Sequence, residues 1–227
     1  MAVAQKQLMN QTIERLNKDI ALFPQVHPIT ADMKLTHKGV SRLVMIDRYA
    51  FKDTAKLTLS TGDFVVLTIK EDPKFPARGL GHITAIDWEN KKATVLVEEE
   101  FRSALDHPEE TETGLVVRSL DVIEKPLEIF YEQIARRNAT GMASVEKTEE
   151  KRQEWFEKFY HELASMNFVP AGRVLYGAGS NTDVTYFNCY VMPFVQDSRE
   201  GISEHRKQVM EIMSRGGGVG TNGSTLR

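Results

Sequence analysis

The spacing of hydrophobic residues changes along the chain and divides it into helical and strand-like stretches. Residues 10–22 carry Ile13, Leu16, Ile20 and Leu22 at roughly helical spacing, and a proline-containing linker follows. From about residue 36 to 122 the hydrophobic runs are short and separated by turn residues, which is typical of β-strands. The expected strands lie in SRLVMI, KLTLS, DFVVLTIK, GHITAIDW, KKATVLVEE and GLVVRSLDVI. Short strands at intervals of about ten residues predict a small barrel or sandwich.

Helical spacing returns after this region. Pro126 suits a first helical turn, and we expect one helix there and a second over residues 148–166. Residues 170–182 (PAGRVLYGAGSNT) are predicted to form a loop, and the β-branched and aromatic residues of TYFNCYVMP a buried strand. Asp197 or Ser198 can cap a further helix that ends near residue 214. Its inward face is expected to carry Ile202, Val209, Ile212 and Met213.

Composition excludes several classes of protein. The 227 residues have a net charge of −3, which does not favour a nucleic acid partner. The sequence contains neither a long apolar run nor a signal-peptide core, so we expect a cytoplasmic protein without a membrane partner. Cys189 is the single cysteine, which excludes an internal disulfide and a multi-cysteine metal site. The histidines lack metal-ligand spacing, so we expect no metal site.

Two motifs allow alternative interpretations. Residues 218–223 (GVGTNG) fit the dinucleotide-binding pattern, but that pattern requires a strand before it and a helix after it, and here a helix precedes it. A helix stop followed by a tail remains an alternative for the glycine run. The strand region also mixes basic residues with Phe75 and Trp88, as single-stranded nucleic acid sites do, but acidic residues oppose them. We favour a solvated surface of mixed charge.

Three motifs in order carry a resemblance to a known family. FNCYVMP, then DSREGI, then SRGGGVGTNGSTLR resemble the start of the catalytic barrel of ribonucleotide reductases. PAGRVLYGAG and the small β region most resemble the class II, adenosylcobalamin-dependent branch. The resemblance implies an α+β chain with a small β-barrel-like N-terminal domain, helices, and the first elements of a ten-stranded α/β barrel. It implies divisions at 1–34 (helix and linker), 35–124 (β domain), 125–182 (helical region) and 183–227 (truncated catalytic barrel).

The resemblance also implies roles for particular residues. In this family a thiyl radical removes the 3′ hydrogen of a ribonucleotide, and two further cysteines reduce C2′. Cys189 matches the first reducing cysteine, although from its type and context alone a lone cysteine is more often a small core residue. Asn188 matches a substrate-contacting neighbour, and Gly217 and Gly218 bring the backbone close to the substrate. Gly172 stands where the family usually has Ser or Thr, so only a backbone contact to the substrate phosphate is expected there.

A regulatory site follows from the same resemblance. Asp197, Ser198 and Arg227 fall where family members bind a deoxynucleoside triphosphate effector. Arginine suits a triphosphate, and an acidic or hydroxyl side chain suits a sugar hydroxyl. The alternatives are helix capping for Asp197 and Ser198 and a charged terminus for Arg227.

The resemblance further implies that the chain is about the first third of an enzyme. The radical cysteine, the second reducing cysteine and the remaining barrel would come from a complementary C-terminal chain, which would also hold most of the adenosylcobalamin site. The other expected partners are a ribonucleotide, the effector and a thioredoxin-like reductant. Two other functions remain open: a nucleic acid or protein binding module with a relic reductase segment, and an assembly scaffold.

Overall fold

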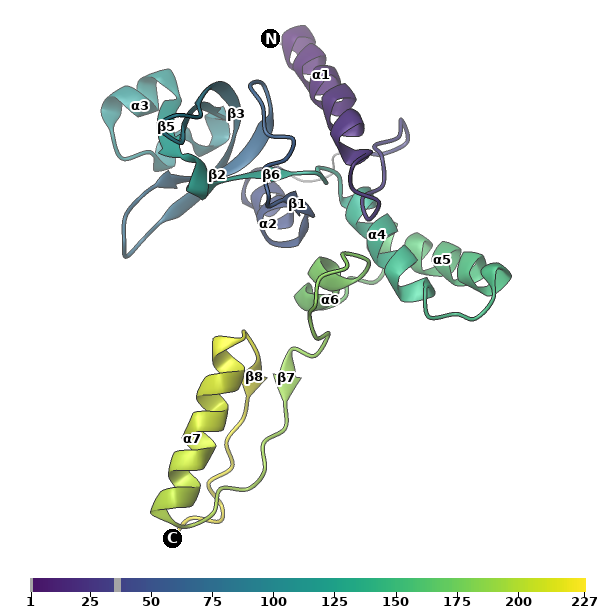
Figure 1. Ribbon diagram of the computed structural model, residues 1–227, viewed down its shortest axis with the longest axis vertical. Helices are drawn as coiled ribbons and strands as arrows, with labels where there is room; N and C mark the ends of the chain where they lie inside the picture. The colour runs from purple at the N-terminus through teal and green to yellow at the C-terminus, as the bar shows by residue number, and fades with distance from the viewer. Residues whose placement is uncertain (1, 35–37) are drawn as a thin grey trace. The chain divides into compact units, whose positions relative to one another are not determined.

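A computed structural model describes residues 2–34 and 38–227, which form two compact units, residues 1–181 and 182–227 (Figure 1). The predicted domain boundary at residue 35 lies outside the described residues. The helices of the N-terminal unit are α1 (Ala2–Ile20), α2 (Gly39–Tyr49), α3 (Pro108–Thr113), α4 (Tyr131–Ala143), α5 (Glu149–Ala164) and α6 (Gly172–Gly177). Its strands are β1 (Lys52–Asp53), β2 (Phe64–Lys70), β3 (Ala77–Asp87), β4 (Lys92–Val97), β5 (Leu115–Ser119) and β6 (Ile123–Pro126). Two 3₁₀ turns, η1 (Glu99–Ala104) and η2 (Leu120–Val122), complete it.

The six strands form one antiparallel sheet in the order β1-β6-β2-β3-β4-β5. The α+β class is therefore confirmed. Among the described residues β1 and β5 lie at opposite ends of this order and do not pair with each other, so closure into a barrel is not confirmed.

Sheet and helices of this unit share one hydrophobic core. Strand β2 is central and largely buried, and Val65, Val66 and Leu67 are fully inaccessible to solvent. The same cluster of buried side chains includes Ile20 from α1 and Ile134 from α4. Because one core holds both parts, the strands and the helices after them form one structural unit.

The strand predicted in SRLVMI is wrong, because these residues belong to helix α2. Its buried side chains Arg42, Met45 and Ile46 follow the helical spacing i, i+3, i+4. A short apolar run is compatible with a strand as well as a helix, so the sequence alone did not show this spacing. The strand predicted in KLTLS is also wrong. The main-chain amides of Thr58 and Ser60 donate to the carboxylates of Asp53 and Asp63 at 2.8 and 2.7 Å, so aspartate side chains replace a strand partner.

The helix expected at Pro126 begins later. Pro126 is the last residue of β6, and the amide of Leu127 continues the ladder by donating to the Phe51 carbonyl at 2.8 Å. Helix α4 starts at Tyr131, where the Gln133 side chain accepts from the amides of Ile129 and Phe130. The helix predicted over 148–166 is confirmed as α5. The loop predicted over 170–182 contains the short helix α6.

The C-terminal unit has a strand–helix–strand order: β7 (Cys189–Tyr190), α7 (Arg199–Ser214) and β8 (Gly218–Val219). Strands β7 and β8 pair in parallel, as the long crossover through α7 requires. The predicted helix ending near 214 is confirmed. The predicted buried strand over TYFNCYVMP is only two residues long, and its neighbours Phe187 and Val191 are exposed within this unit.

Candidate functional site

The C-terminal unit places its cysteine beside a glycine. In the β7–β8 pair Cys189 is opposite Gly218, and the Gly218 amide donates to the Asn188 carbonyl at 2.7 Å. A β-carbon at residue 218 would lie 3.2 Å from the Cys189 sulfur. Residue 218 therefore decides how much room the thiol has, and glycine leaves the most.

Gly216 and Gly217, which precede Gly218, end helix α7 and form the turn that leads into β8. Gly216 has φ of +74°, and its amide donates to the Met213 carbonyl, while the Gly217 amide donates to Ile212. This is a Schellman motif, which glycine favours because it adopts positive φ without strain. A β-carbon at Gly217 would lie 2.6 Å from the Ile212 side chain. The helix-stop interpretation is thus correct for the start of the run, and Gly218 belongs to a strand.

Cys189 is a free, exposed thiol, and Asn188 before it is also exposed. An exposed thiol does not match the alternative of a small core residue. The sequence holds one cysteine, so any disulfide that Cys189 forms needs a sulfur from another chain segment or molecule.

The three predicted effector residues lie around the start of α7. The Ser198 hydroxyl caps the helix by accepting from the Gly201 amide at 3.0 Å. Asp197 forms an ion pair with Arg227, with the carboxylate oxygen 3.0 Å from Nε. The structure therefore brings Asp197 and Arg227 together and gives Ser198 the capping role that was the alternative.

Besides the Asp197–Arg227 pair, two side-chain contacts hold the chain after β8 against the rest of this unit. His205 on α7 is buried, and its Nε2 lies 3.1 Å from the Thr221 hydroxyl. The Thr225 hydroxyl donates to the Val195 carbonyl. Sequence reasoning gave His205 no role, because its partner is a threonine after the glycine run. Ile202 and Met213, expected to face inward, are exposed in this unit, while Val209 and Ile212 are half-buried.

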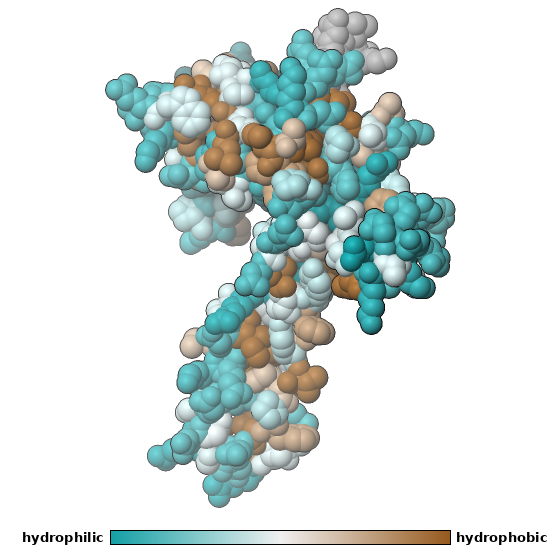
Figure 2. All heavy atoms as spheres, turned by 45° about the vertical axis from the view of Figure 1, so that its right-hand side comes forward, coloured by the Kyte–Doolittle hydropathy of each residue, from teal (hydrophilic) through white to brown (hydrophobic). Residues whose placement is uncertain are grey.

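An open apolar cleft of about 870 Å³ lies along α7 in the C-terminal unit. Its hydrophobic lining residues are Val195, Ile202, Val209, Met210, Met213 and Leu226. Figure 2 shows hydrophobic residues among polar ones on the surface of this unit, in the lower part of the view. A unit of this size that leaves so much apolar surface uncovered is typical of a segment that packs against further structure.

Gly172, the predicted phosphate contact, is the first residue of α6 in the N-terminal unit. The Tyr49 ring lies against it, and a β-carbon at residue 172 would be 3.1 Å from Cε1 and 3.4 Å from the phenol oxygen. The space of a side chain at this position is therefore occupied by Tyr49.

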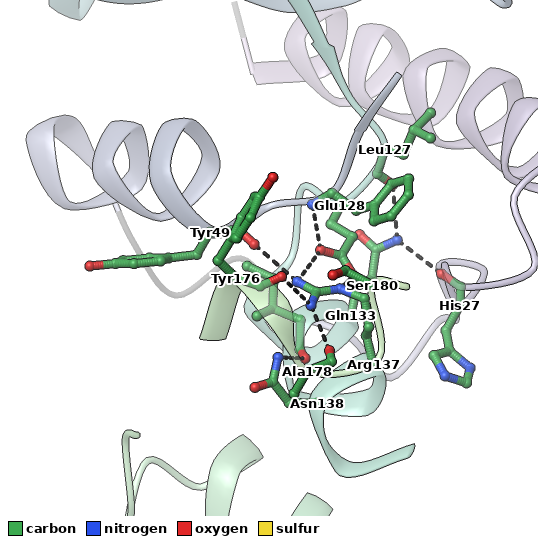
Figure 3. A network of polar contacts seen from close by, with 12 residues as sticks. His27, Tyr49, Leu127, Glu128, Gln133, Arg137, Asn138, Tyr176, Ala178 and Ser180 are labelled. Carbon is green, nitrogen blue, oxygen red and sulfur yellow. Dashed lines mark hydrogen bonds and ion pairs between the residues drawn. The ribbon is translucent and has the colours of Figure 1, made fainter. Parts of the chain in front are cut away.

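A buried polar network surrounds the other end of α6 (Figure 3). The Arg137 guanidinium forms a fork with the Glu128 carboxylate, with N–O distances of 2.8 and 3.0 Å. It also donates to the main-chain carbonyls of Tyr49, Leu175, Tyr176 and Ala178. Sequence reasoning missed this network, because a buried arginine in an amphipathic helix looks like a surface residue.

The described residues contain neither a metal-binding cluster nor a helix that could span a membrane. In residues 2–34 and 38–227 no group of three or more His, Cys, Asp or Glu side chains could hold a metal ion. Across the same residues the helices are all too short or too polar to cross a membrane.

Part of the chain matches a known protein family. Residues 119–183 match the family model "Ribonucleotide reductase, all-alpha domain". Neither a curated protein nor a solved structure matches the chain. The matched segment runs from the end of β5 through α6, so it contains Gly172 and Arg137 and ends before Cys189. It supports a relationship to ribonucleotide reductases and an oxidoreductase of that type.

Proposed function

We propose that this chain is the N-terminal part of a class II ribonucleotide reductase, which reduces ribonucleotides to 2′-deoxyribonucleotides for DNA synthesis. The observation that carries the proposal is the pairing of Cys189 with Gly218, which leaves an exposed thiol next to bare backbone. The upstream match over residues 119–183 supports the same family. The order of motifs in the sequence supports the family as well, and the resemblance of PAGRVLYGAG and the small β region supports the class.

In this proposal Cys189 is a reductant. Its thiol and a second thiol, from the complementary reductase segment, together supply two electrons and two protons to the substrate radical. The C2′–OH bond breaks, water leaves, a C2′–H bond forms, and the two sulfurs join as a disulfide about 2 Å long. A thioredoxin-like dithiol then reduces the disulfide. Such chemistry requires a reducing compartment, so we propose a cytoplasmic location.

The proposed substrate contacts include the main chain of three glycines, of which Gly172 and Gly218 are half-buried and Gly217 is buried. Gly217 and Gly218 permit close approach, Asn188 contributes a side chain, and the main chain at Gly172 contacts phosphate. The Asp197–Arg227 pair and Ser198 would bind a deoxynucleoside triphosphate, with Arg227 on the phosphates.

Adenosylcobalamin is the cofactor that the class II resemblance implies, and it would generate the radical. The cleft described in the C-terminal unit has a mixed lining, half of it methionine and aliphatic residues and half polar residues that include His205, Arg206 and Lys207. This lining has no feature specific for adenosylcobalamin. We therefore assign the cofactor site to the complementary segment.

The experiment combines the chain with adenosylcobalamin, a ribonucleotide and dithiothreitol, with and without the complementary segment. The proposal predicts deoxynucleotide only when the complementary segment is present. Product from the chain alone, or no product from the combined segments, would contradict it. The binding-module alternative predicts no product in either case.

A further inference from the structure

In the N-terminal unit, Arg137 contacts the carboxyl end of α6 and Tyr49 contacts its amino end. At the carboxyl end each guanidinium nitrogen of Arg137 has an acceptor. Nε donates to Glu128, and Nη1 to the carbonyls of Tyr176 and Ala178 at 3.1 and 2.8 Å. Nη2 donates to Glu128 and to the carbonyls of Tyr49 and Leu175. A guanidinium with all its donors used in this way fixes the main chain around it.

The ion pair at the centre of this network is buried completely. Arg137 is 1% exposed and Glu128 is fully inaccessible to solvent. Burying an ion pair costs desolvation energy, and well-packed apolar residues are often as stabilising, so stability alone does not explain such a pair. The Arg137–Glu128 pair instead fixes the orientation of the chain, because carbonyls at the end of α6 point toward the Arg137 guanidinium.

Close backbone packing leaves α6 little freedom. A β-carbon at Gly141 on α4 would lie 2.2 Å from the Gly179 amide nitrogen, and one at Gly179 would lie 2.3 Å from the Arg137 carbonyl oxygen. At the other end the Tyr49 ring lies against Gly172. Tyr49 thus contacts α6 directly through its ring at Gly172, and its carbonyl accepts from Arg137 of α4, which also donates to carbonyls of α6.

We propose that Arg137 and Tyr49 are positioning residues that fix residues 172–180, and with them the main chain at Gly172. Tyr49 belongs to α2, which packs in the core of the N-terminal sheet. The sheet region would therefore act as a brace for the substrate-binding segment. The contacts described above support the structural role of Arg137 and Tyr49. Their effect on substrate binding rests on the proposed function.

The test uses two variants and one control. Arg137→Lys keeps the charge but loses the fork, and Tyr49→Leu removes the ring and leaves the buried ion pair intact. The control is Arg136→Lys, since Arg136 is its neighbour on α4 and pairs with exposed Asp32 at 3.5 Å. Hydrogen exchange is followed in residues 172–180 and, for comparison, in β2 and β3. In the reductase assembled with its complementary segment, kcat and KM for ribonucleotide are measured as well.

We expect exchange in 172–180 to become at least about tenfold faster in both variants, with β2 and β3 changed little and the control like wild type. We also expect KM to rise about tenfold with kcat nearly unchanged, because ground-state binding is lost. Uniform acceleration across the unit, or an unchanged KM, would mean that these residues are merely structural and would overturn the inference. If Arg137→Lys does not fold, Tyr49→Leu alone decides. An inactive wild-type assembly would contradict the proposed function. The hydrogen-exchange measurement would still show whether Arg137 and Tyr49 fix residues 172–180.

Discussion

At the scale of single residues, the absence of a side chain at Gly218 leaves space beside the Cys189 thiol. A β-carbon at residue 218 would approach the sulfur to 3.2 Å, which is tight but can be relieved by movement of the thiol. We expect Gly218→Ala to leave the melting temperature nearly unchanged and to displace the sulfur. The rate of thiol modification by a disulfide reagent should therefore differ from that of wild type.

Gly220→Ala is the matched control, because a β-carbon there has no atom within 4 Å. It should react like wild type. Equal rates for both alanine variants and wild type would show that residue 218 does not shape the environment of the thiol.

Residue identities alone predicted some of these residues and missed others. Cys189, Gly217 and Gly218 were selected because their motifs are ordered and specific, and the structure places Cys189 and Gly218 on adjacent strands. His205, Tyr49 and Arg137 were missed, because each acts through a partner that sequence spacing does not reveal. The Arg137 contact to Tyr49, for example, joins residues 88 positions apart.

At the scale of elements, the start of α7 offers a second prediction. The Asp197–Arg227 pair has an Arg227 side chain that is 88% exposed, and exposed pairs contribute little to stability. We expect Arg227→Gln to leave thermal unfolding unchanged and to weaken binding of a deoxynucleoside triphosphate at least about tenfold, since a charged hydrogen-bond donor is lost. Calorimetric titration of the assembled reductase measures this. Undiminished affinity would remove Arg227 from the effector site.

The strand β3 carries a half-buried titratable group. The pKa of His82 lies below its ordinary 6.5, mainly because of burial, and Arg42 lowers it further while Glu98, Asp63 and a backbone contact with Gly62 oppose this. The folded state thus favours neutral His82. Its contribution to stability is complete above pH 6.5 and is lost as pH falls below that value toward the lowered pKa.

His82→Gln should therefore flatten the fall in unfolding free energy between about pH 6.5 and 5, compared with wild type. His161→Gln, at a position 75% exposed, is the control. Chemical denaturation across this range gives the slope. A slope identical in wild type and His82→Gln would contradict this assignment.

At the scale of elements, the sequence predicted the strands that lie between clear turn residues. The strands β2 to β5 were predicted from short apolar runs separated by such turns, and α5 and α7 from helical spacing. Helix α2 was predicted as a strand, because its short apolar run fits both periods. The segment 56–60 was predicted as a strand because its aspartate partners, Asp53 and Asp63, were not recognised as turn-forming.

At the scale of the whole molecule, the two units differ in how well they cover their apolar surface. The N-terminal unit has a continuous buried core, whereas the C-terminal unit exposes Phe187, Phe194 and Met210 and has an apolar cleft. In the chain alone, we expect amide exchange in residues 183–227 to be much faster than in the sheet. Adding the complementary segment should slow it. Exchange as slow as in β2 and β3 without a partner would contradict the idea that this unit packs against further barrel elements.

The central claim is that Cys189 reduces the substrate, and Cys189→Ser tests it most directly. Serine is similar in size but cannot form the disulfide that carries two electrons. Because Cys189 is exposed, the unfolding free energy should change by less than about 0.5 kcal/mol. The measurement is steady-state deoxynucleotide production by the assembled reductase, wild type beside Cys189→Ser, with thermal melting of both. We predict that multiple turnover is abolished while the melting temperature stays the same. A serine variant that turns over at near the wild-type rate would contradict the account.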